Sequence, residues 1–118
     1  MKLKQGRIPH RKVKIDGIEF DSQAEAERYR ELKLLQRAGR IKGLTCHPHY
    51  ELIPTQRIAG RETLRKHSYT ADFAYDDAQG RLHVEDVKSR RTRAERDYII
   101  NRKLMWMLHG IYVEEVLR

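Results

Sequence analysis

Residues 69–88, Tyr-Thr-Ala-Asp-Phe-Ala-Tyr-Asp-Asp-Ala-Gln-Gly-Arg-Leu-His-Val-Glu-Asp-Val-Lys, decide the fold of this chain. Apolar and polar residues alternate on both sides of the Asp-Asp-Ala-Gln-Gly cluster, and alternation with a period of two is typical of β-strands. The cluster itself favours a hairpin loop of three to five residues, because its glycine tolerates a positive φ. The stretch therefore predicts a β-hairpin.

Charged residues lie inside both arms of this hairpin. Asp72 lies opposite the face of the first arm that carries Tyr69, Ala71, Phe73 and Tyr75. The second arm places Leu82, Val84, Asp86 and Lys88 on one face and His83, Glu85 and Val87 on the other. Asp86 and Lys88 therefore end an apolar run, where an unpaired charge is costly to bury. A bulge in this arm would exchange the positions of Glu85 and Asp86.

The pairing register of the hairpin determines whether its carboxylates meet. If Asp72 pairs opposite Asp86, with residues 78–80 as the loop, both side chains point to the same side of the sheet. Directly opposite Cβ atoms lie roughly 4.5 to 5.5 Å apart, so two carboxylates there can hold one divalent cation. A register shifted by one residue would separate them. Because like charges disfavour pairing, the aligned register predicts a cation between Asp72 and Asp86.

Asp72 followed by Asp86-Val87-Lys88 resembles the signature of the PD-(D/E)XK nuclease superfamily. More narrowly, four segments resemble short phage and prophage proteins of that superfamily that are described as endonuclease-like: Phe20-Asp21-Ser22 with Glu25, residues 69–73, residues 84–88 and Gly110-Ile111. The resemblance covers nearly all of the chain after Lys14. Ala71 stands where the name of the superfamily implies a proline, and substitution at that position is frequent in the superfamily.

The resemblance implies an α/β fold with a restriction-endonuclease-like core: a helix, a three-stranded antiparallel meander, a second helix and a closing strand. It also implies a site in which Mg²⁺, or Mn²⁺ as a substitute, is held by Asp72, Asp86 and the carbonyl of Val87. Lys88 would position the attacking water or stabilise the developing charge. Glu25 would add a metal ligand or orient a water. Catalysis is therefore expected from Glu25, Asp72, Asp86 and Lys88.

The first helix is predicted over residues 22–38 by its two ends. Ser22 and Glu25 form a Ser-X-X-Glu capping box, and Gly39 supplies the stop. Its apolar stripe consists of Ala24, Tyr29, Leu32, Leu35 and Ala38. Glu25 and Glu27 flank this stripe on opposite sides, so periodicity does not choose between them, and capping alone would explain Glu25. The family resemblance selects Glu25 as the acid of the site.

The second helix is predicted over residues 94–109, from a capping box at residues 92–95 to Gly110. Its apolar stripe consists of Ile100, Leu104, Met107 and Leu108. Lys103 is expected on the inner side of this helix, where it either reaches the site or extends along apolar surface to solvent. Further strands are predicted in a short hairpin over residues 13–20, with Asp16-Gly17 as its turn, and over residues 47–53 and 111–117.

The composition favours a polyanionic partner. The 118 residues contain 25 Lys and Arg against 17 Asp and Glu, which gives a net charge of +8 and a pI near 9.8. No apolar run approaches the ~20 residues of a membrane span and no signal sequence is present, so we expect DNA rather than a membrane as partner. We also expect a cytoplasmic protein, in the bacterial host if phage-encoded. No small-molecule cofactor is expected. Cys46 is the single cysteine, which excludes an internal disulfide. The Cys46-His47-Pro48-His49 run offers three metal ligands, but the start of a strand explains it equally simply.

Two basic segments flank the predicted strands. Residues 1–14 are interpreted as a flexible arm, which either contacts phosphates or is merely solvated, and residues 15–118 as one nuclease domain. Residues 55–66 are interpreted as a basic loop, which either neutralises phosphates or is a solvated connection. The candidate nucleic-acid contacts are Arg57, Arg61, Arg65, Lys66, Arg90, Arg91, Arg93 and Lys103.

These observations predict a Mg²⁺-dependent endodeoxyribonuclease of phage or prophage type that hydrolyses DNA phosphodiester bonds, with branched, junction-like DNA as its first substrate and a homodimer as its working form. The alternative is a non-catalytic DNA-binding or host-modulating module on the same fold. Asp72, Asp86 and Lys88 argue against that alternative, because a pure binder would gain more phosphate affinity from neutral or basic residues at the two acidic positions. Charge alone does not distinguish DNA from RNA, so a nuclease that acts on RNA or a ribosome-associated basic protein remains a third hypothesis.

Overall fold

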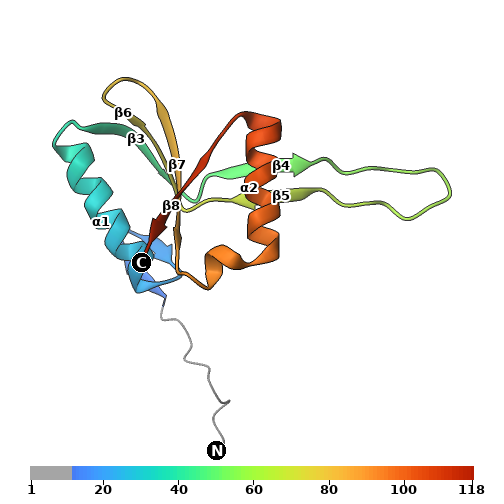
Figure 1. The fold of residues 1–118 in the computed structure, drawn as a ribbon, viewed down its shortest axis with the longest axis horizontal. Coiled ribbons are helices and arrows are strands. Elements are labelled where there is room, and N and C mark those ends of the chain that lie inside the picture. Colours follow the sequence, from blue (N-terminus) through green and yellow to red (C-terminus); the bar gives the residue numbers. More distant parts are fainter. Residues whose placement is uncertain (1–11) are drawn as a thin grey trace, which may run out of the picture.

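The computed structural model describes residues 12–118, and most of the predicted arm over residues 1–14 lies outside the described part. The first strand, β1 (Val13–Ile15), already begins inside the range predicted for the arm (Figure 1). β1 pairs with β2 (Ile18–Phe20) across the Asp16-Gly17 turn, as the sequence predicts. Both turn residues have a positive φ, 54° and 76°, as the tight turn of a two-residue hairpin requires.

The helix α1 (Gln23–Arg37) begins and ends where its caps predict. The Ser22 hydroxyl accepts a hydrogen bond from the Glu25 amide at 3.1 Å, and Gly39 has a φ of 76° just beyond the helix. The buried residues of α1 are Glu25, Ala26, Tyr29 and Leu32. Leu35 and Ala38 were expected inside but are exposed, because the helix turns the side that carries Ala26 and Arg28 toward the sheet.

Four strands form the main sheet, in the spatial order β3-β6-β7-β8. They are β3 (Ile41–Cys46), β6 (Phe73–Asp77), β7 (Leu82–Lys88) and β8 (Val113–Leu117). β3, β6 and β7 pair antiparallel, and β8 pairs parallel to β7 after the crossover through the second helix. The strand β3 was not predicted, because its central Gly43 and polar neighbours interrupt the alternation of apolar residues.

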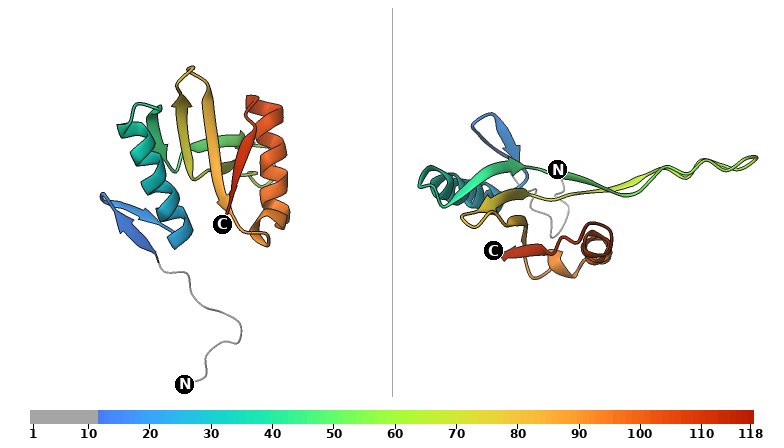
Figure 2. Two further views of the ribbon diagram at one scale, coloured as in Figure 1. Left: turned by 60° about the vertical axis from the view of Figure 1, so that its left-hand side comes forward. Right: turned by 90° about the horizontal axis from the view of Figure 1, so that it is seen from above.

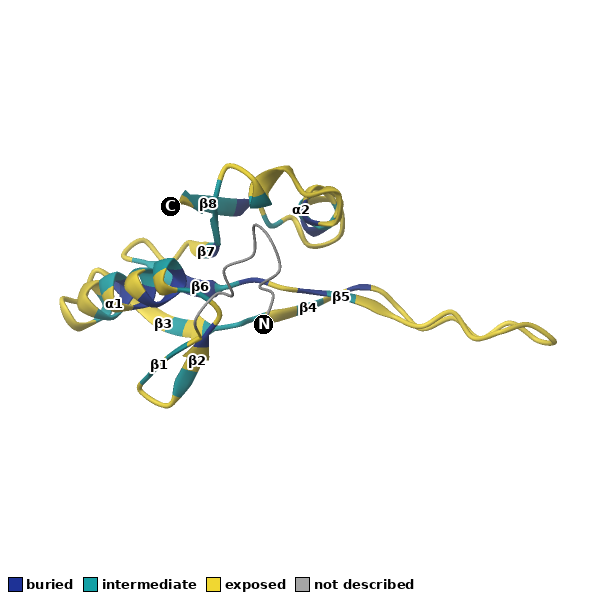
Figure 3. Cartoon of the chain, turned by 90° about the horizontal axis from the view of Figure 1, so that it is seen from below, coloured by how far each residue is buried: buried dark blue, intermediate teal, exposed yellow. Residues whose placement is uncertain are grey.

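Two further strands leave the body of the molecule as a long hairpin (Figure 1). These are β4 (His49–Ile53) and β5 (His67–Thr70), which pair antiparallel. The connection over residues 54–66 is largely the basic loop that the sequence predicts, and an isolated bridge between Gln56 and Leu64 continues the pairing beyond the strands. Figure 3 shows that the connection is exposed along its length.

Residues 69–75 do not form one continuous strand. β5 ends at Thr70 and β6 begins at Phe73, because the chain changes partners there: β5 pairs with β4, whereas β6 pairs with β3 and β7. Tyr69 and Ala71 consequently pack into a different apolar cluster from Phe73 and Tyr75. The expectation of one shared face for these four residues is therefore wrong.

The main sheet separates two apolar clusters. Ala74 and Val84 pack with Tyr98 and Met105 of the second helix, whereas Phe73 packs with residues of α1. Successive side chains of a strand point to opposite faces, so the two helices cover opposite faces of the sheet. The two views of Figure 2 show this arrangement, with the sheet between the helices.

The second helix, α2 (Arg96–His109), follows the 3₁₀ turn η1 (Thr92–Ala94) and ends at Gly110, whose φ is 65°. The predicted capping box is wrong, because the Thr92 hydroxyl contacts Ser89 and the N-cap residue Glu95 makes no side-chain cap hydrogen bond. The predicted apolar stripe is also wrong for most of its members. Tyr98 and Met105 are the buried residues of α2, and its other large apolar side chains lie mostly outside, as Figure 3 shows.

None of the helices among residues 12–118 is long and apolar enough to cross a lipid bilayer.

Candidate functional site

The register of the β6–β7 hairpin brings the two candidate carboxylates together. Phe73 pairs with Glu85 and Ala74 with Val84, so the next position along β6 places Asp72 opposite Asp86. The Asp72 amide donates to the carbonyl of Glu85 at 3.1 Å and to Oδ1 of Asp86 at 3.0 Å. The expected register is therefore confirmed.

Neutral donors hold both carboxylates in place. Asp86 accepts from the Tyr69 hydroxyl as well as from the Asp72 amide, and Oδ2 of Asp72 accepts from the Val87 amide at 2.7 Å. The Asp72 carbonyl in turn accepts from the His47 amide at 2.9 Å. Asp72 lies at the break between β5 and β6, and these hydrogen bonds fix its position, unlike that of an exposed loop residue.

Burial makes the carboxylate pair expensive to ionise. Asp86 is 3% exposed and Asp72 is half-buried. Burial raises the pKa of Asp72, and the neighbouring charges of Asp86 and Glu25 raise it further. Burial also raises the pKa of Asp86, against hydrogen bonding by Tyr69 and the charge of Lys88, which lower it. Two buried acids this close favour sharing a proton or binding a cation.

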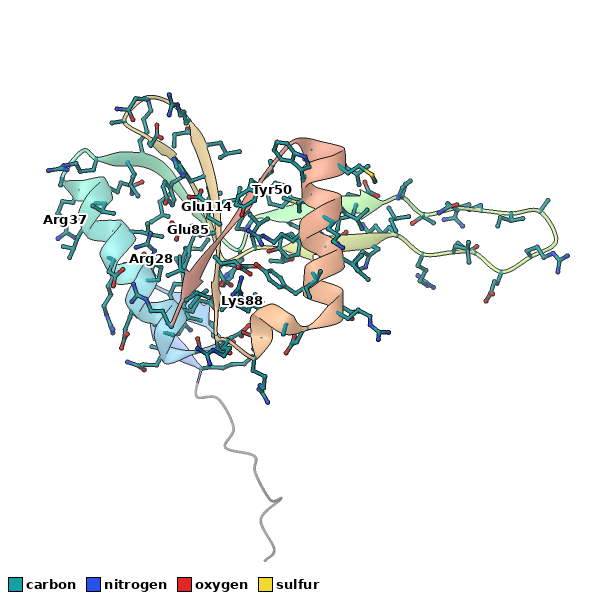
Figure 4. All side chains as sticks on the ribbon, viewed as in Figure 1. Arg28, Arg37, Tyr50, Glu85, Lys88 and Glu114 are labelled. Carbon is teal, nitrogen blue, oxygen red and sulfur yellow. The ribbon has the colours of Figure 1, made fainter. Side chains whose placement is uncertain are left out.

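Lys88 lies on the same face of β7 as Asp86, as the alternation predicts. It is half-buried, and its Nζ lies 4.3 Å from the centre of the Tyr98 ring. Figure 4 shows Lys88 on the side of β7 that faces α2. The ammonium is close enough to lower the pKa of both Asp72 and Asp86. A positive charge therefore adjoins the acidic pair without forming an ion pair that would neutralise it.

Glu25 approaches the pair from α1 but does not join it. It is 5% exposed, and its Oε1 lies 2.9 Å from Nε2 of His47. Burial raises the pKa of Glu25, and the hydrogen bond with His47 opposes that effect. The structure thus distinguishes Glu25 from Glu27, which is exposed. The expected second half of the capping box is replaced by this contact with His47.

Three aromatic residues of this site were missed by sequence reasoning. His47 has a φ of 54° and links Glu25 to the strand break at Asp72. Tyr69 donates to Asp86, and the Tyr98 ring lies under Lys88. Two signals in the sequence were available: a histidine directly before a proline, and a tyrosine within an apolar run. The tyrosine is a signal because a buried tyrosine hydroxyl needs a hydrogen-bond partner.

Glu85, the neighbour of Asp86, has a different environment. Its carboxylate accepts from Nε and Nη2 of Arg28 at 2.8 and 2.7 Å, and from the Tyr75 hydroxyl. Figure 4 shows Arg28 of α1 and Glu85 of β7 directed toward one another. The strand is regular here, so the exchange of Glu85 with Asp86 that a bulge would cause does not occur.

A metal ion held by three side chains does not fit this arrangement. Within residues 12–118, no group of three or more His, Cys, Asp and Glu side chains is placed to hold a metal ion, so neither Glu25 nor the Cys46-His47-Pro48-His49 run completes such a group. Mg²⁺, however, needs only one or two protein carboxylates, because it keeps waters and phosphate oxygens as its other ligands. The Asp72 and Asp86 carboxylates satisfy that requirement.

The candidate nucleic-acid contacts occupy two exposed regions. Arg57, Arg61, Arg65 and Lys66 lie on the connection between β4 and β5, and Arg90, Arg91 and Arg93 lie around η1. Lys103 is also exposed, so its expected position on the inner side of α2 is wrong. The reason is the rotation of α2, which buries Tyr98 and Met105 instead of the predicted stripe.

Fold and site together define a small α/β protein with a buried pair of carboxylates beside a lysine. Residues 6–114 match the model of the family described as "Protein of unknown function (DUF1064)", and the chain belongs to that family. Comparisons with curated proteins and with solved structures found no match.

Proposed function

We propose that this protein is a Mg²⁺-dependent endodeoxyribonuclease with a PD-(D/E)XK core. The observation that carries the proposal is the pairing of Asp72 with Asp86 beside Lys88. Two acidic side chains this close to one another destabilise the folded state, and no neighbouring structural contact explains their presence. Groups with such perturbed pKa values concentrate at functional sites. The resemblance in sequence and the geometry therefore agree on the same three side chains.

The order of elements supports the finer fold assignment. α1 precedes the antiparallel strands β3, β6 and β7, and α2 then leads into β8, parallel to β7. This is the succession of helix, meander, helix and closing strand that the resemblance implies. The β4–β5 hairpin is an insertion within the meander, between β3 and β6.

In the proposed mechanism Asp72 and Asp86 would hold Mg²⁺, with the Val87 carbonyl as the expected third protein ligand. When bound, the ion lowers the pKa of water and stabilises charge on the phosphate that is attacked. Lys88 positions the attacking water by hydrogen bonding and offsets the negative charge that develops. Glu25 and His47 orient a water at the edge of the pair, and Tyr69 holds the Asp86 carboxylate in place.

The basic regions suit a DNA substrate. The β4–β5 connection projects from the body of the molecule (Figure 1), and its exposed arginines would reach phosphates away from the scissile bond. Branched DNA presents phosphates at several angles, so we keep a junction-like substrate as the first choice. One site per chain cuts one strand at a time, and a homodimer remains our proposal for cutting two.

The test is cleavage of a labelled four-way junction, a plain duplex and single-stranded DNA, each with and without Mg²⁺. Asp72→Asn is the sharpest variant, because the asparagine oxygen still accepts from the Val87 amide while the charge is lost. We expect its rate to fall at least roughly 100-fold, since metal-assisted charge stabilisation is worth several kcal/mol. Asp76→Asn is the matched control, because Asp76 lies four residues further along in β6 and is also half-buried, and this variant should retain activity.

Glu25→Gln and Glu27→Gln form a second matched pair on one helix. Loss of cleavage in the first alone would assign Glu25 to the reaction. If wild type and Asp72→Asn are equally inert yet bind DNA equally well, the fold serves binding and the catalytic proposal is wrong. Faster cleavage of RNA than of any DNA would instead make the substrate RNA.

A further inference from the structure

A groove of about 790 Å³ lies between α2 and the segment that contains β8. Ile99, Arg102, Lys103 and Trp106 line its helical wall, at the spacing of a single helix face. Tyr112 and Glu115 come from the segment that contains β8. The proposed mechanism uses none of these residues.

Two aromatic rings on the groove are left open to solvent. Trp106 is 62% exposed and Tyr112 is 65% exposed, although both are large apolar side chains. Arg102 keeps Tyr112 in position: its guanidinium carbon lies 4.6 Å from the centre of the ring, and its Nε donates to the Val113 carbonyl at 2.9 Å. The groove therefore presents two exposed aromatic rings, one of them supported by Arg102, and aromatic side chains are the groups on which a nucleobase stacks.

Positive charge surrounds this aromatic surface. Arg90, Arg93, Arg102 and Lys103 line the groove, and Glu115 is the one carboxylate among its described lining residues. Glu115 pairs with Arg93 at 3.1 Å and lies 3.7 Å from Arg102. Arg90 and Lys103 are exposed among the lining residues, where phosphates can reach them.

Tyr98 joins this groove to the carboxylate pair. Its side chain lines the groove, while Nζ of Lys88 lies 4.3 Å from the centre of its ring. Tyr98 is 6% exposed, and burial together with its contact to the Glu115 carboxylate of the groove raises the pKa of its hydroxyl. The ring of Tyr98 is therefore shared by the carboxylate site and the groove.

We propose that this groove binds an unpaired nucleotide of the DNA strand whose phosphate lies at Asp72 and Asp86, with its base stacked on Trp106 and Tyr112. The inference rests on the proposed function for the identity of the strand, and it makes a single-stranded or flapped end part of the substrate. Arg90 and Lys103 contact the phosphates that flank the bound nucleotide.

A DNA strand suits the groove better than a second copy of the chain. A symmetric dimer through this face would place the Arg90 and Lys103 of one copy near the same cationic groove of the other. The chain as a whole carries a net charge of +8, which adds to that repulsion. A nucleotide supplies both an aromatic face and negative charge.

Trp106 is the single tryptophan of the chain, so its fluorescence reports on this groove alone. The experiment titrates the full-length protein, in EDTA to prevent cleavage, with a short oligothymidylate, an abasic strand of equal length and a blunt duplex. We expect saturable quenching by oligothymidylate and little by the other two. Oligouridylate serves as the RNA arm, and tighter binding of it would overturn the assignment to DNA.

Tyr112→Ala keeps the reporter and removes one of the two stacking rings, and because Tyr112 is exposed the fold should be retained. Stacking is worth roughly 1–3 kcal/mol per base, so its affinity for oligothymidylate should fall about 5- to 100-fold. Trp106→Ala, measured by polarisation of a labelled strand, should lose a similar factor. Met107→Ala is the control, because Met107 is 69% exposed on the same helix and does not line the groove.

The outcomes separate this inference from the proposed function. Quenching that disappears with Tyr112→Ala supports the groove whether or not the protein cleaves DNA. Mg²⁺-dependent cleavage without quenching would overturn the groove and leave the nuclease intact. A third outcome would be Trp106 fluorescence that depends on protein concentration, together with a dimer in sedimentation that Trp106→Ala converts to a monomer. This outcome would show that the groove is an interface between two copies of the chain, and it would overturn the inference of nucleotide binding.

Discussion

Glu85 and Asp86 are adjacent carboxylates of β7 with opposite surroundings. Glu85 accepts two hydrogen bonds from the Arg28 guanidinium, which neutralises it. Asp86 instead accepts from the hydroxyl of Tyr69 and the amide of Asp72, which are neutral donors. A carboxylate whose charge is neutralised by an arginine stabilises the fold through that ion pair. A carboxylate held only by neutral donors keeps its negative charge uncompensated and can still bind a cation.

Arg28→Met tests the structural role of Glu85. The side chain of Glu85 is 4% exposed, so removal of its cation leaves a buried unpaired charge. We expect a loss of about 3–5 kcal/mol in the free energy of unfolding, measured by urea denaturation. Adding Glu85→Gln removes the charge and keeps an acceptor for Tyr75, so the double variant should recover most of that loss. A double variant as unstable as Arg28→Met alone would contradict this account.

At the scale of elements, the β4–β5 hairpin is divided into a packed base and an exposed tip. Its base is attached to α2, since His67 contacts Asn101 at 2.7 Å and His109 donates to the Glu51 carbonyl at 3.0 Å. Its tip beyond the Gln56–Leu64 bridge is exposed throughout. The tip can therefore be shortened without disturbing the core.

Replacement of residues 57–63 by Asn-Gly closes the tip with a two-residue turn directly after that bridge. Stability should change little, because exposed residues alone are removed. The slope of log affinity for duplex DNA against log salt should become shallower by up to about 2, since Arg57 and Arg61 are lost and each phosphate contact contributes about 0.9. Arg57→Gln with Arg61→Gln is the shape-preserving control and should show the same slope. An unchanged slope in both would remove the tip from the DNA interface.

At the scale of the whole molecule, the acidic pair makes global stability depend on pH. Burial raises the pKa of Asp72 in the folded state above its unfolded value, so the folded protein binds the proton more tightly. The stability that proton binding at Asp72 contributes is fully present below its pKa in the unfolded chain, near 4. It is lost as the pH rises through the pKa of Asp72 in the folded protein. Glu31 acts in the opposite direction: hydrogen bonds from Arg118 and Arg28 lower its pKa to about 2, so its contribution is lost on acidification.

Asp72→Asn isolates the first effect. In EDTA its free energy of unfolding should equal that of wild type near pH 4 and exceed it at neutral pH by at least about 1.4 kcal/mol, the value of one pKa unit. Thermal melts would show this as a gain of roughly 4 to 8 °C for a domain of about 100 residues. Addition of Mg²⁺ should stabilise wild type and not the variant. A constant difference across the pH range would show that Asp72 is ionised normally.

Local patterns predicted a large part of this molecule. The turn at Asp16-Gly17, the cap at Ser22 and the stop at Gly39 all follow from preferences that act over a few residues. The buried face of α2 could not be predicted in this way. Apolar residues surround that helix on several sides, so periodicity alone does not choose the side that packs.

The sequence by itself determined the turn between β6 and β7 and the shared face of Asp86 and Lys88, because turn chemistry and the two-residue period of a strand are local properties. It left two registers of that hairpin open, and the structure has the one that sets Asp72 opposite Asp86. Tertiary structure alone decided the break at Asp72, the pairing of Arg28 with Glu85 and the contact of Glu25 with His47. It also left Trp106 and Tyr112 open on one groove. Such features arise from contacts between residues far apart in the chain, which no local pattern records.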